Sequence, residues 1–274
     1  MNRFMDALEQ GNLETLRKYP KADLHNHFAL GGSRRFLYQA TGKKIEPLVH
    51  PLASMAEMDQ WSQKYIGQYF NSTEGRKLLI RATFQQAKED GVTVLEIGED
   101  VWGLKEFFHN DIDELVESFT SAQREIAPEI ELRLQIGLSR HCPISYLEDC
   151  LSYFWGNKNF YSIDLYGDEF AQPIENFKGI YRRAKKEGLR LKAHVGEWGT
   201  AKDIRTAVEE LELDEVQHGI AAAGDESVIR FLAENKIRLN ITPTSNVLLG
   251  RVADMAEHPI GKLYRSGIDV TINS

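Results

Sequence analysis

The chain has 274 residues, of which 42% are hydrophobic and 27% are charged, a composition that suits one globular domain with a sizeable core. Its formal net charge is −8 and its sequence pI is about 5.6, which argues against non-specific binding to nucleic acid or anionic membranes. Two cysteines, Cys142 and Cys150, are too few for a disulfide framework in a chain of this length. We expect both to be buried free thiols.

The N-terminal segment, residues 1–21, is polar and amphipathic and lacks the apolar core of a signal peptide. No stretch of the sequence approaches the roughly 18–20 apolar residues of a membrane span. We therefore expect a cytoplasmic protein with neither a membrane nor a nucleic acid as partner.

Short apolar runs alternate with longer amphipathic stretches along the chain, a pattern that favours parallel strands joined by helices. The predicted strands are residues 21–27, 92–97, 131–138, 161–165, 190–195, 215–218, 238–241 and 269–273. The predicted helices between them are residues 74–89, 113–126, 174–186, 200–211, 226–234 and 259–264. Gly91 and Gly188 follow two of these helices, where glycine is a common stop signal.

Eight such strands fit a (β/α)8 barrel of the TIM type in number and spacing. The alternative is an open doubly wound sheet, whose usual GxGxxG signature after the first strand is absent. Residues 30–80 are too many for a simple first connection, and Trp61, Tyr65, Tyr69 and Phe70 recur near the helical period. We expect these residues to form a helical insertion that packs on the barrel. The insertion either has only this packing role or also lines the mouth of a pocket.

The first predicted strand carries Asp23, His25 and His27 on one face, because side chains alternate along a strand. Buried imidazoles without partners cost free energy, and a metal ion bound to both nitrogens would satisfy them. Taken alone, such a pair is more often structural or exposed than metal-binding.

Two further histidines end predicted strands: His194 the fifth and His218 the sixth. Active sites of such barrels lie at the carboxyl ends of the strands, so Glu197, in the turn after His194, is placed to transfer a proton to or from a ligand. The alternatives are an exposed helix N-cap region for Glu197 and a satisfied core position for His218. The remaining histidines are predicted in loops or helices: His50, His109, His141 and His258. Because four of eight histidines gather at three strand ends, the sequence predicts a site for zinc or a neighbouring transition metal.

In these segments the chain resembles the adenosine deaminase family of zinc-dependent amidohydrolases. The matching segments, in family order, are residues 20–27, 163–169, 193–197, 217–219, 243–247, 258–260 and 270–274. The resemblance implies one barrel domain over residues 1–274, one zinc ion per chain, a small aminopurine substrate, and hydrolytic release of ammonia.

The resemblance also assigns roles to residues of this chain. It implies that His25, His27 and His194 are the metal ligands. It implies that Glu197 protonates the purine ring and that His218 orients the attacking water.

The resemblance assigns two more residues to substrate binding: Asp164 in the fourth predicted strand and Gly167 just after it, the glycine through its backbone. The sequence departs from the family at two points. The family continues after its eighth strand with two aspartates, one a zinc ligand, whereas this sequence ends at Ser274, so we expect a C-terminally incomplete barrel that lacks its last helix rather than a degenerate relative.

The second departure lies in residues 27–33, which carry one extra residue and lack the acid that holds the ribose hydroxyl in adenosine-specific members. A modified nucleoside or another aminopurine derivative is therefore an alternative to adenosine. Arg34 and Arg35 follow, either as contacts for an anionic ligand group or as a solvated helix start.

Three functional hypotheses follow. The first is zinc-dependent hydrolytic deamination of an adenosine-like aminopurine nucleoside. The second is a zinc amidohydrolase that cleaves another C–N or an ester bond, which a product assay separates from the first. The third is an inactive relative that binds only metal or purine.

Overall fold

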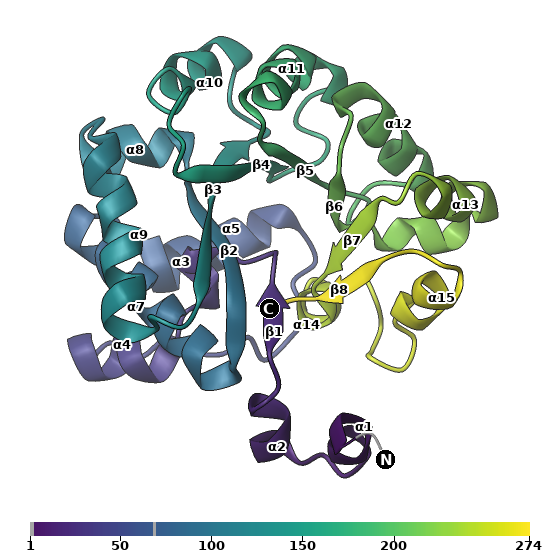
Figure 1. Ribbon diagram of the computed structural model, residues 1–274, viewed down its shortest axis with the longest axis horizontal. Helices are drawn as coiled ribbons and strands as arrows, with labels where there is room; N and C mark the ends of the chain where they lie inside the picture. Colours follow the sequence, from purple (N-terminus) through teal and green to yellow (C-terminus); the bar gives the residue numbers. More distant parts are fainter. Residues whose placement is uncertain (1–2, 68–69) are drawn as a thin grey trace.

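The structure is a computed structural model, and it describes residues 3–67 and 70–274. Within these residues eight strands run parallel and pair in chain order, from β1 to β8. The strands are β1 (Lys21–Asp23), β2 (Val92–Asp100), β3 (Glu131–Ser139), β4 (Phe160–Tyr166), β5 (Arg190–Val195), β6 (Glu215–His218), β7 (Arg238–Ile241) and β8 (Val270–Ile272). They curve into a ring with helices around it (Figure 1). The predicted (β/α)8 barrel is confirmed, and the doubly wound alternative is wrong because such a sheet reverses its strand order.

Side chains join β8 to the segment that follows β1 and so close the ring. The Leu24 N–H donates to Oδ1 of Asn273 at 2.8 Å, and Nδ2 of Asn26 donates to Oγ of Ser274 at 3.0 Å. The Ser274 hydroxyl also donates to the Asp23 carboxylate. These bonds connect the first and last strands of the barrel (Figure 1).

The first strand is shorter than predicted, since β1 ends at Asp23 rather than at residue 27. Beyond that point side chains take the place of a neighbouring strand. The carbonyl of Leu24 accepts from Nζ of Lys192 at 3.1 Å and from Nε2 of Gln217 at 3.3 Å. His25 and His27 therefore follow β1, and the prediction that they lie on one face of a strand is wrong. Their side chains nevertheless reach the same site.

Most of the helices surround the ring of strands (Figure 1). They are α1 (Arg3–Glu9), α2 (Leu13–Arg17), α3 (Phe28–Gly31), α4 (Arg34–Thr41), α5 (Met55–Ser62), the π-helical turn η1 (Gln63–Gly67), α7 (Thr73–Asp90), α8 (Val101–Phe108), α9 (Ile112–Ile126), α10 (Ile144–Leu151), the 3-10 turn η2 (Ile174–Phe177), α11 (Lys178–Glu187), α12 (Ala201–Leu211), the 3-10 turn η3 (Ile220–Gly224), α13 (Glu226–Glu234), α14 (Pro243–Leu248) and α15 (Ile260–Arg265). All six predicted helices are present within a few residues. The sequence did not predict α8, α10 and α14, which are short and follow β2, β3 and β7 closely.

The segment between β1 and α7 is helical, as predicted, with α3 and α4 packed on α7. The N–H of Leu52 donates to the carbonyl of Leu248 in α14, at 2.7 Å. Because α14 follows β7, this insertion spans the carboxyl ends of the strands, which supports the prediction that it lines the mouth of the site. Tyr69, predicted as part of its aromatic set, lies outside the described residues.

The barrel interior beneath the carboxyl ends is partly charged. Lys192 is wholly buried and pairs with Glu96 at 2.7 Å and with Glu215 at 3.1 Å. Because each buried charge has opposite charges and hydrogen bonds around it, the cluster holds its shape, and through Lys192 it fixes the Leu24 carbonyl.

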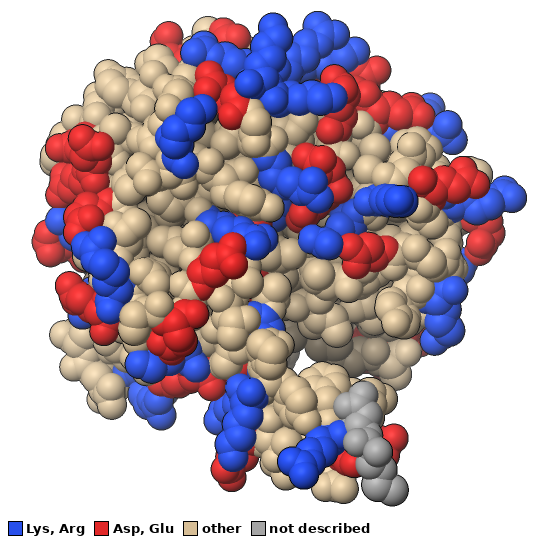
Figure 2. Space-filling view, viewed as in Figure 1, with Lys and Arg blue, Asp and Glu red and all other residues tan. Residues whose placement is uncertain are grey.

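The cysteines, the surface charges and the helix lengths describe the rest of the molecule. Cys142 and Cys150 are buried free thiols, as predicted. Acidic and basic side chains alternate over the face in Figure 2, with basic groups gathered over α11. Among the described residues, no helix combines the length and apolarity needed to cross a membrane.

Candidate active site

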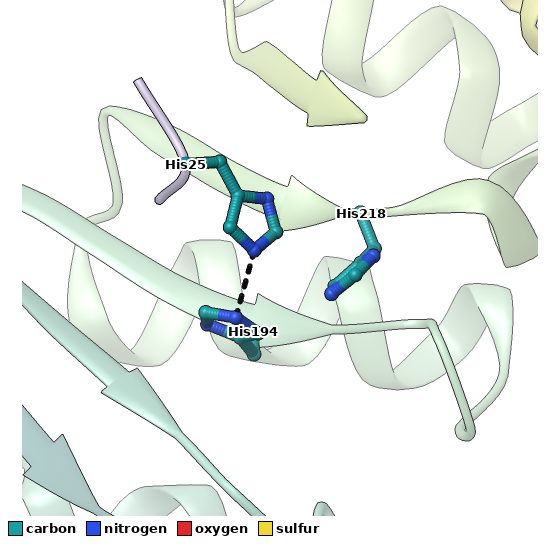
Figure 3. Close-up of side chains that lie close together, drawn as sticks. All are labelled: His25, His194 and His218. Atoms are coloured by element: carbon teal, nitrogen blue, oxygen red, sulfur yellow. Dashed lines mark hydrogen bonds between the residues drawn. The ribbon is translucent and has the colours of Figure 1, made fainter. Parts of the chain in front are cut away.

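Four histidines meet at the carboxyl ends of β1, β5 and β6. His25 follows β1, His194 belongs to β5 and His218 ends β6; one ring nitrogen from each lies within 4.8 Å of the other two, and all three side chains are buried. Figure 3 shows these three rings pointing toward one another. His27 joins them, because its Nε2 lies 3.1 Å from Nε2 of His194. The structure thus gathers every histidine that the sequence singled out.

The outer nitrogens of His25 and His194 both face hydrogen-bond acceptors. Nδ1 of His25 lies 2.8 Å from the carbonyl of Asn240, and Nδ1 of His194 lies 3.3 Å from the carboxylate of Asp164. Each Nδ1 therefore carries the proton, which leaves a lone pair on each Nε2. These two Nε2 atoms are 2.9 Å apart (Figure 3). Two lone pairs at that distance repel, and a cation between them removes the repulsion.

The spacing also fits a metal ion. Two nitrogens bound at ~2.0–2.1 Å in a tetrahedral site lie ~3.3 Å from each other. The distances of 2.9 and 3.1 Å from Nε2 of His194 to its two neighbours are close to this value. His194 thus lies at ligand spacing from both His25 and His27, while the three ring nitrogens that all lie within 4.8 Å of one another belong to His25, His194 and His218.

Burial keeps these imidazoles neutral, the form that binds metal. Loss of solvent lowers the pKa of His27, and it lowers the pKa of His25, His194 and His218 well below the usual value. Repulsion between neighbouring rings further lowers the pKa of His25, His194 and His218. The four rings are therefore unprotonated at neutral pH.

His218 differs from the other rings, because its Nδ1 faces a donor. The backbone N–H of Ile260 donates to Nδ1 of His258, so Nε2 of His258 donates to Oδ1 of Asn246, at 3.2 Å. This bond orients the amide, and Nδ2 of Asn246 then donates to Nδ1 of His218 at 3.1 Å. With Asn246 donating to Nδ1, the proton of the neutral His218 ring lies on Nε2, which favours a hydrogen-bond donor over a metal ligand at that nitrogen.

The backbone at His218 is strained in the manner of functional sites. Its φ is +64°, in the left-handed region that side chains seldom adopt. Gly219 follows with φ +65°, and a side chain there would meet Leu239 at 2.7 Å. Glycine is thus required at position 219 both by the backbone conformation and by the space available.

Glu197 lies in the turn between β5 and α12, with its side chain only 8% exposed. Its Oε1 accepts from Nδ2 of Asn246 at 3.1 Å and lies 3.3 Å from Nδ1 of His218. Burial, and after it the negative charge of Glu169, raises the pKa of Glu197 to about 8. At neutral pH this carboxyl is mostly protonated and able to donate a proton.

Asn246 and His258 are site residues that the sequence did not single out. Asn246 is completely buried and joins Glu197 to His218, and His258 orients it. His258 lies in a loop, as predicted, and its ring also belongs to the site. Only the matching of residues 243–247 and 258–260 to the family could have pointed to them, since no local pattern does.

Asp164 and Gly167 lie on and just after β4. The Asp164 carboxylate faces the outer nitrogen of His194 and accepts from Nε2 of Gln217 at 3.4 Å. Gly167 has φ +96°, and the ring of the preceding Tyr166 lies 5.0 Å from the ring of His27. Their predicted substrate contacts stay predictions; the observed contact of Asp164 is with a histidine.

Arg34 and Arg35 are exposed at the start of α4. Arg35 pairs with Glu89 of α7 at 2.7 Å, away from the histidines. This position favours the solvated helix start over a contact with an anionic ligand.

Comparisons with known proteins agree with this geometry. The family described as adenosine deaminase matches residues 20–274. A putative adenosine/adenine deaminase of Treponema pallidum is 34% identical over 263 residues, which cover 96% of this chain and 88% of that protein. The adenosine deaminase of Plasmodium falciparum is 28% identical over 94% of this chain and 75% of its own length.

Solved structures share the fold. The adenine deaminase of Arthrobacter aurescens superposes with a TM-score of 0.75 at 22% identity, over 93% of this chain and 81% of that one. A zinc-bound amidohydrolase from Burkholderia ambifaria gives a TM-score of 0.75 at 21% identity, over 96% of this chain and 77% of that one.

Proposed function

Because the chain belongs to the adenosine deaminase family, a family of hydrolases, we propose that it is a zinc-dependent enzyme that hydrolytically deaminates an adenosine-like aminopurine nucleoside. The observation that carries the proposal is the approach of Nε2 of His25 and Nε2 of His194 to 2.9 Å, in a histidine cluster that also contacts the buried carboxyl of Glu197 through His218. The product besides the deaminated purine is ammonia.

The proposed metal ligands are His25, His27 and His194. Neutral imidazoles suit zinc, and three of them form a common catalytic donor set. A zinc ion held there supplies a nucleophile at neutral pH by lowering the pKa of water. Asp164 orients the His194 ring from behind, as carboxylates do for metal-binding histidines.

The proton steps fall to Glu197 and His218. We assign to Glu197 the donation of a proton to a ring nitrogen of the purine, which makes the carbon bearing the amine more electrophilic. Nε2–H of His218 donates a hydrogen bond to the attacking water and so fixes its direction. Asn246 contacts both side chains and keeps them in register. Gly167 is proposed to contact the purine through its backbone.

The free base adenine is the second candidate substrate. The residues after His27 begin with Phe28, which is buried, and residues 28–33 contain no acid to hold a ribose hydroxyl. Relatives named adenine deaminase are in keeping with this observation. Because neither observation places a substrate, both purines belong in the same assay.

The test is ammonia release by the zinc-loaded chain from adenosine, adenine, N6-methyladenosine and AMP. We expect turnover of at least one, accompanied by one zinc ion per chain. His194→Ala is the control for contaminating activity, and it should release no ammonia. If no aminopurine is turned over at one zinc per chain, the proposal is refuted.

A further inference from the structure

A buried glutamate outside the predicted site holds the turn that carries the proposed proton donor. Glu169 lies after β4, three residues beyond Tyr166, and only 6% of it is exposed. Its carboxylate reaches across to the turn between β5 and α12, where it meets backbone N–H groups rather than a basic side chain.

Three consecutive amides donate to this one carboxylate. The N–H of Gly196 donates to Oε2 at 2.8 Å, and those of Glu197 and Trp198 donate to Oε1 at 3.0 and 2.8 Å. The middle amide belongs to Glu197 itself. We propose that Glu169 is a positioning residue for the deamination reaction, anchoring the backbone of Glu197 so that its carboxyl meets the substrate at the correct place.

The surroundings are built for this contact. Gly196 has φ +73°, which turns the chain so that successive N–H groups point the same way. A side chain at Gly199 would lie 2.8 Å from Oε2 of Glu169, so the glycine leaves room for the carboxylate. A buried carboxylate with three donors is satisfied, whereas an amide in its place would turn its own N–H groups toward one of them.

The inference rests on the proposed function, since it names what Glu169 does for Glu197. The anchored turn is short, and Asn246 holds only the far end of the Glu197 side chain. Loss of the anchor therefore moves the carboxyl relative to the other site groups. A displacement of about 1 Å costs on the order of 100-fold in rate when the group acts directly on the substrate.

The experiment compares Glu169→Gln and Glu169→Ala with the unaltered chain, all zinc-loaded, on adenosine and adenine. Asp168→Asn is the matched control, because this neighbour is exposed and, among the described residues, its carboxylate accepts a hydrogen bond only from the N–H of Phe170, outside the turn. For Glu169→Gln we expect kcat to fall about tenfold with KM changed less than about threefold, since two of the three bonds can persist. For Glu169→Ala we expect a fall of about 100-fold, so that glutamine rescues part of the loss.

Two further readouts separate positioning from general damage. Zinc content should stay at one per chain, and hydrogen–deuterium exchange should speed up in the peptide that carries residues 196–198 but not in β5. A kcat within twofold of the unaltered chain, a loss confined to KM or zinc content, or unchanged exchange at residues 196–198 would overturn the inference. If the unaltered chain turns over no purine, the proposed function fails instead, and the exchange data alone decide whether Glu169 anchors the turn.

Discussion

Replacing Glu197 by glutamine is expected to lower kcat by two to four orders of magnitude and to stabilise the fold at neutral pH. The carboxyl is buried, and its pKa is raised from 4.5 to about 8. At pH values above the pKa that this carboxyl has in the unfolded chain, the raised pKa lowers the stability of the fold, because the unfolded chain releases a proton that the folded chain keeps. Stability is therefore lost as the pH rises from about 4.5 to 8.

The size of the effect follows from the shift. A pH of 7 lies about 2.5 units above the pKa of the carboxyl in the unfolded chain. At ~1.36 kcal/mol per unit, the raised pKa lowers the free energy of unfolding by about 3 kcal/mol at this pH. Glutamine is neutral at every pH and retains an oxygen for Nδ2 of Asn246. Glu197→Gln should gain about 3 kcal/mol at pH 7 and almost nothing at pH 4.5, while kcat falls 100- to 10,000-fold through loss of the acid.

The assay is chemical unfolding of the metal-free chain at pH 4.5, 6 and 7.5, with ammonia release measured in parallel on the zinc-loaded chain. Glu129→Gln, at an exposed loop position, is the control and should change neither quantity. A variant that is less stable than the unaltered chain at pH 7.5, or whose stability difference does not grow with pH, would show that Glu197 is not held protonated by burial.

Four other substitutions test the remaining assignments. His218→Ala should keep one zinc per chain and lose at least about 100-fold in kcat, whereas His194→Ala should lose the metal itself; equal metal loss in both would make His218 a ligand. Asp164→Asn should weaken zinc affinity about 10- to 100-fold in a competition titration with a chelator, because the amide no longer fixes the His194 ring as a carboxylate does, and an unchanged affinity would leave Asp164 to its predicted substrate contact. Gly167→Ala should cost roughly 1–2 kcal/mol in unfolding free energy because φ is +96° there, and a neutral effect would mean that the backbone relaxes.

The barrel could be predicted from the sequence because its evidence is local. Each strand is a short apolar run, the six predicted helices have amphipathic patterns, and two of them end at a glycine that serves as a stop signal, such as Gly91 with φ +73° after α7. The first strand was extended too far because the side chains that replace its hydrogen bonds, Lys192 and Gln217, lie about 170 residues away in sequence or more. Such contacts leave no trace in a local pattern.

The same difference between local patterns and long-range contacts holds for the site. Histidines at strand ends could be recognised because topology alone brings strand ends together. Asn246, His258 and Glu169 could not, since their roles depend on side chains that meet across loops. The tautomers of His25 and His218 also depend on such partners, so the structure supplies evidence for them that the family resemblance alone does not.

The most direct test of the account is a zinc titration of the metal-free chain with ammonia release as the readout. Adenosine and adenine are each supplied at saturating concentration, and zinc is added in fractions of one equivalent per chain. The account predicts activity that is absent without metal, rises in proportion to zinc and stops rising at one equivalent. Turnover in the metal-free chain, or no ammonia from either purine at one full equivalent, would contradict it.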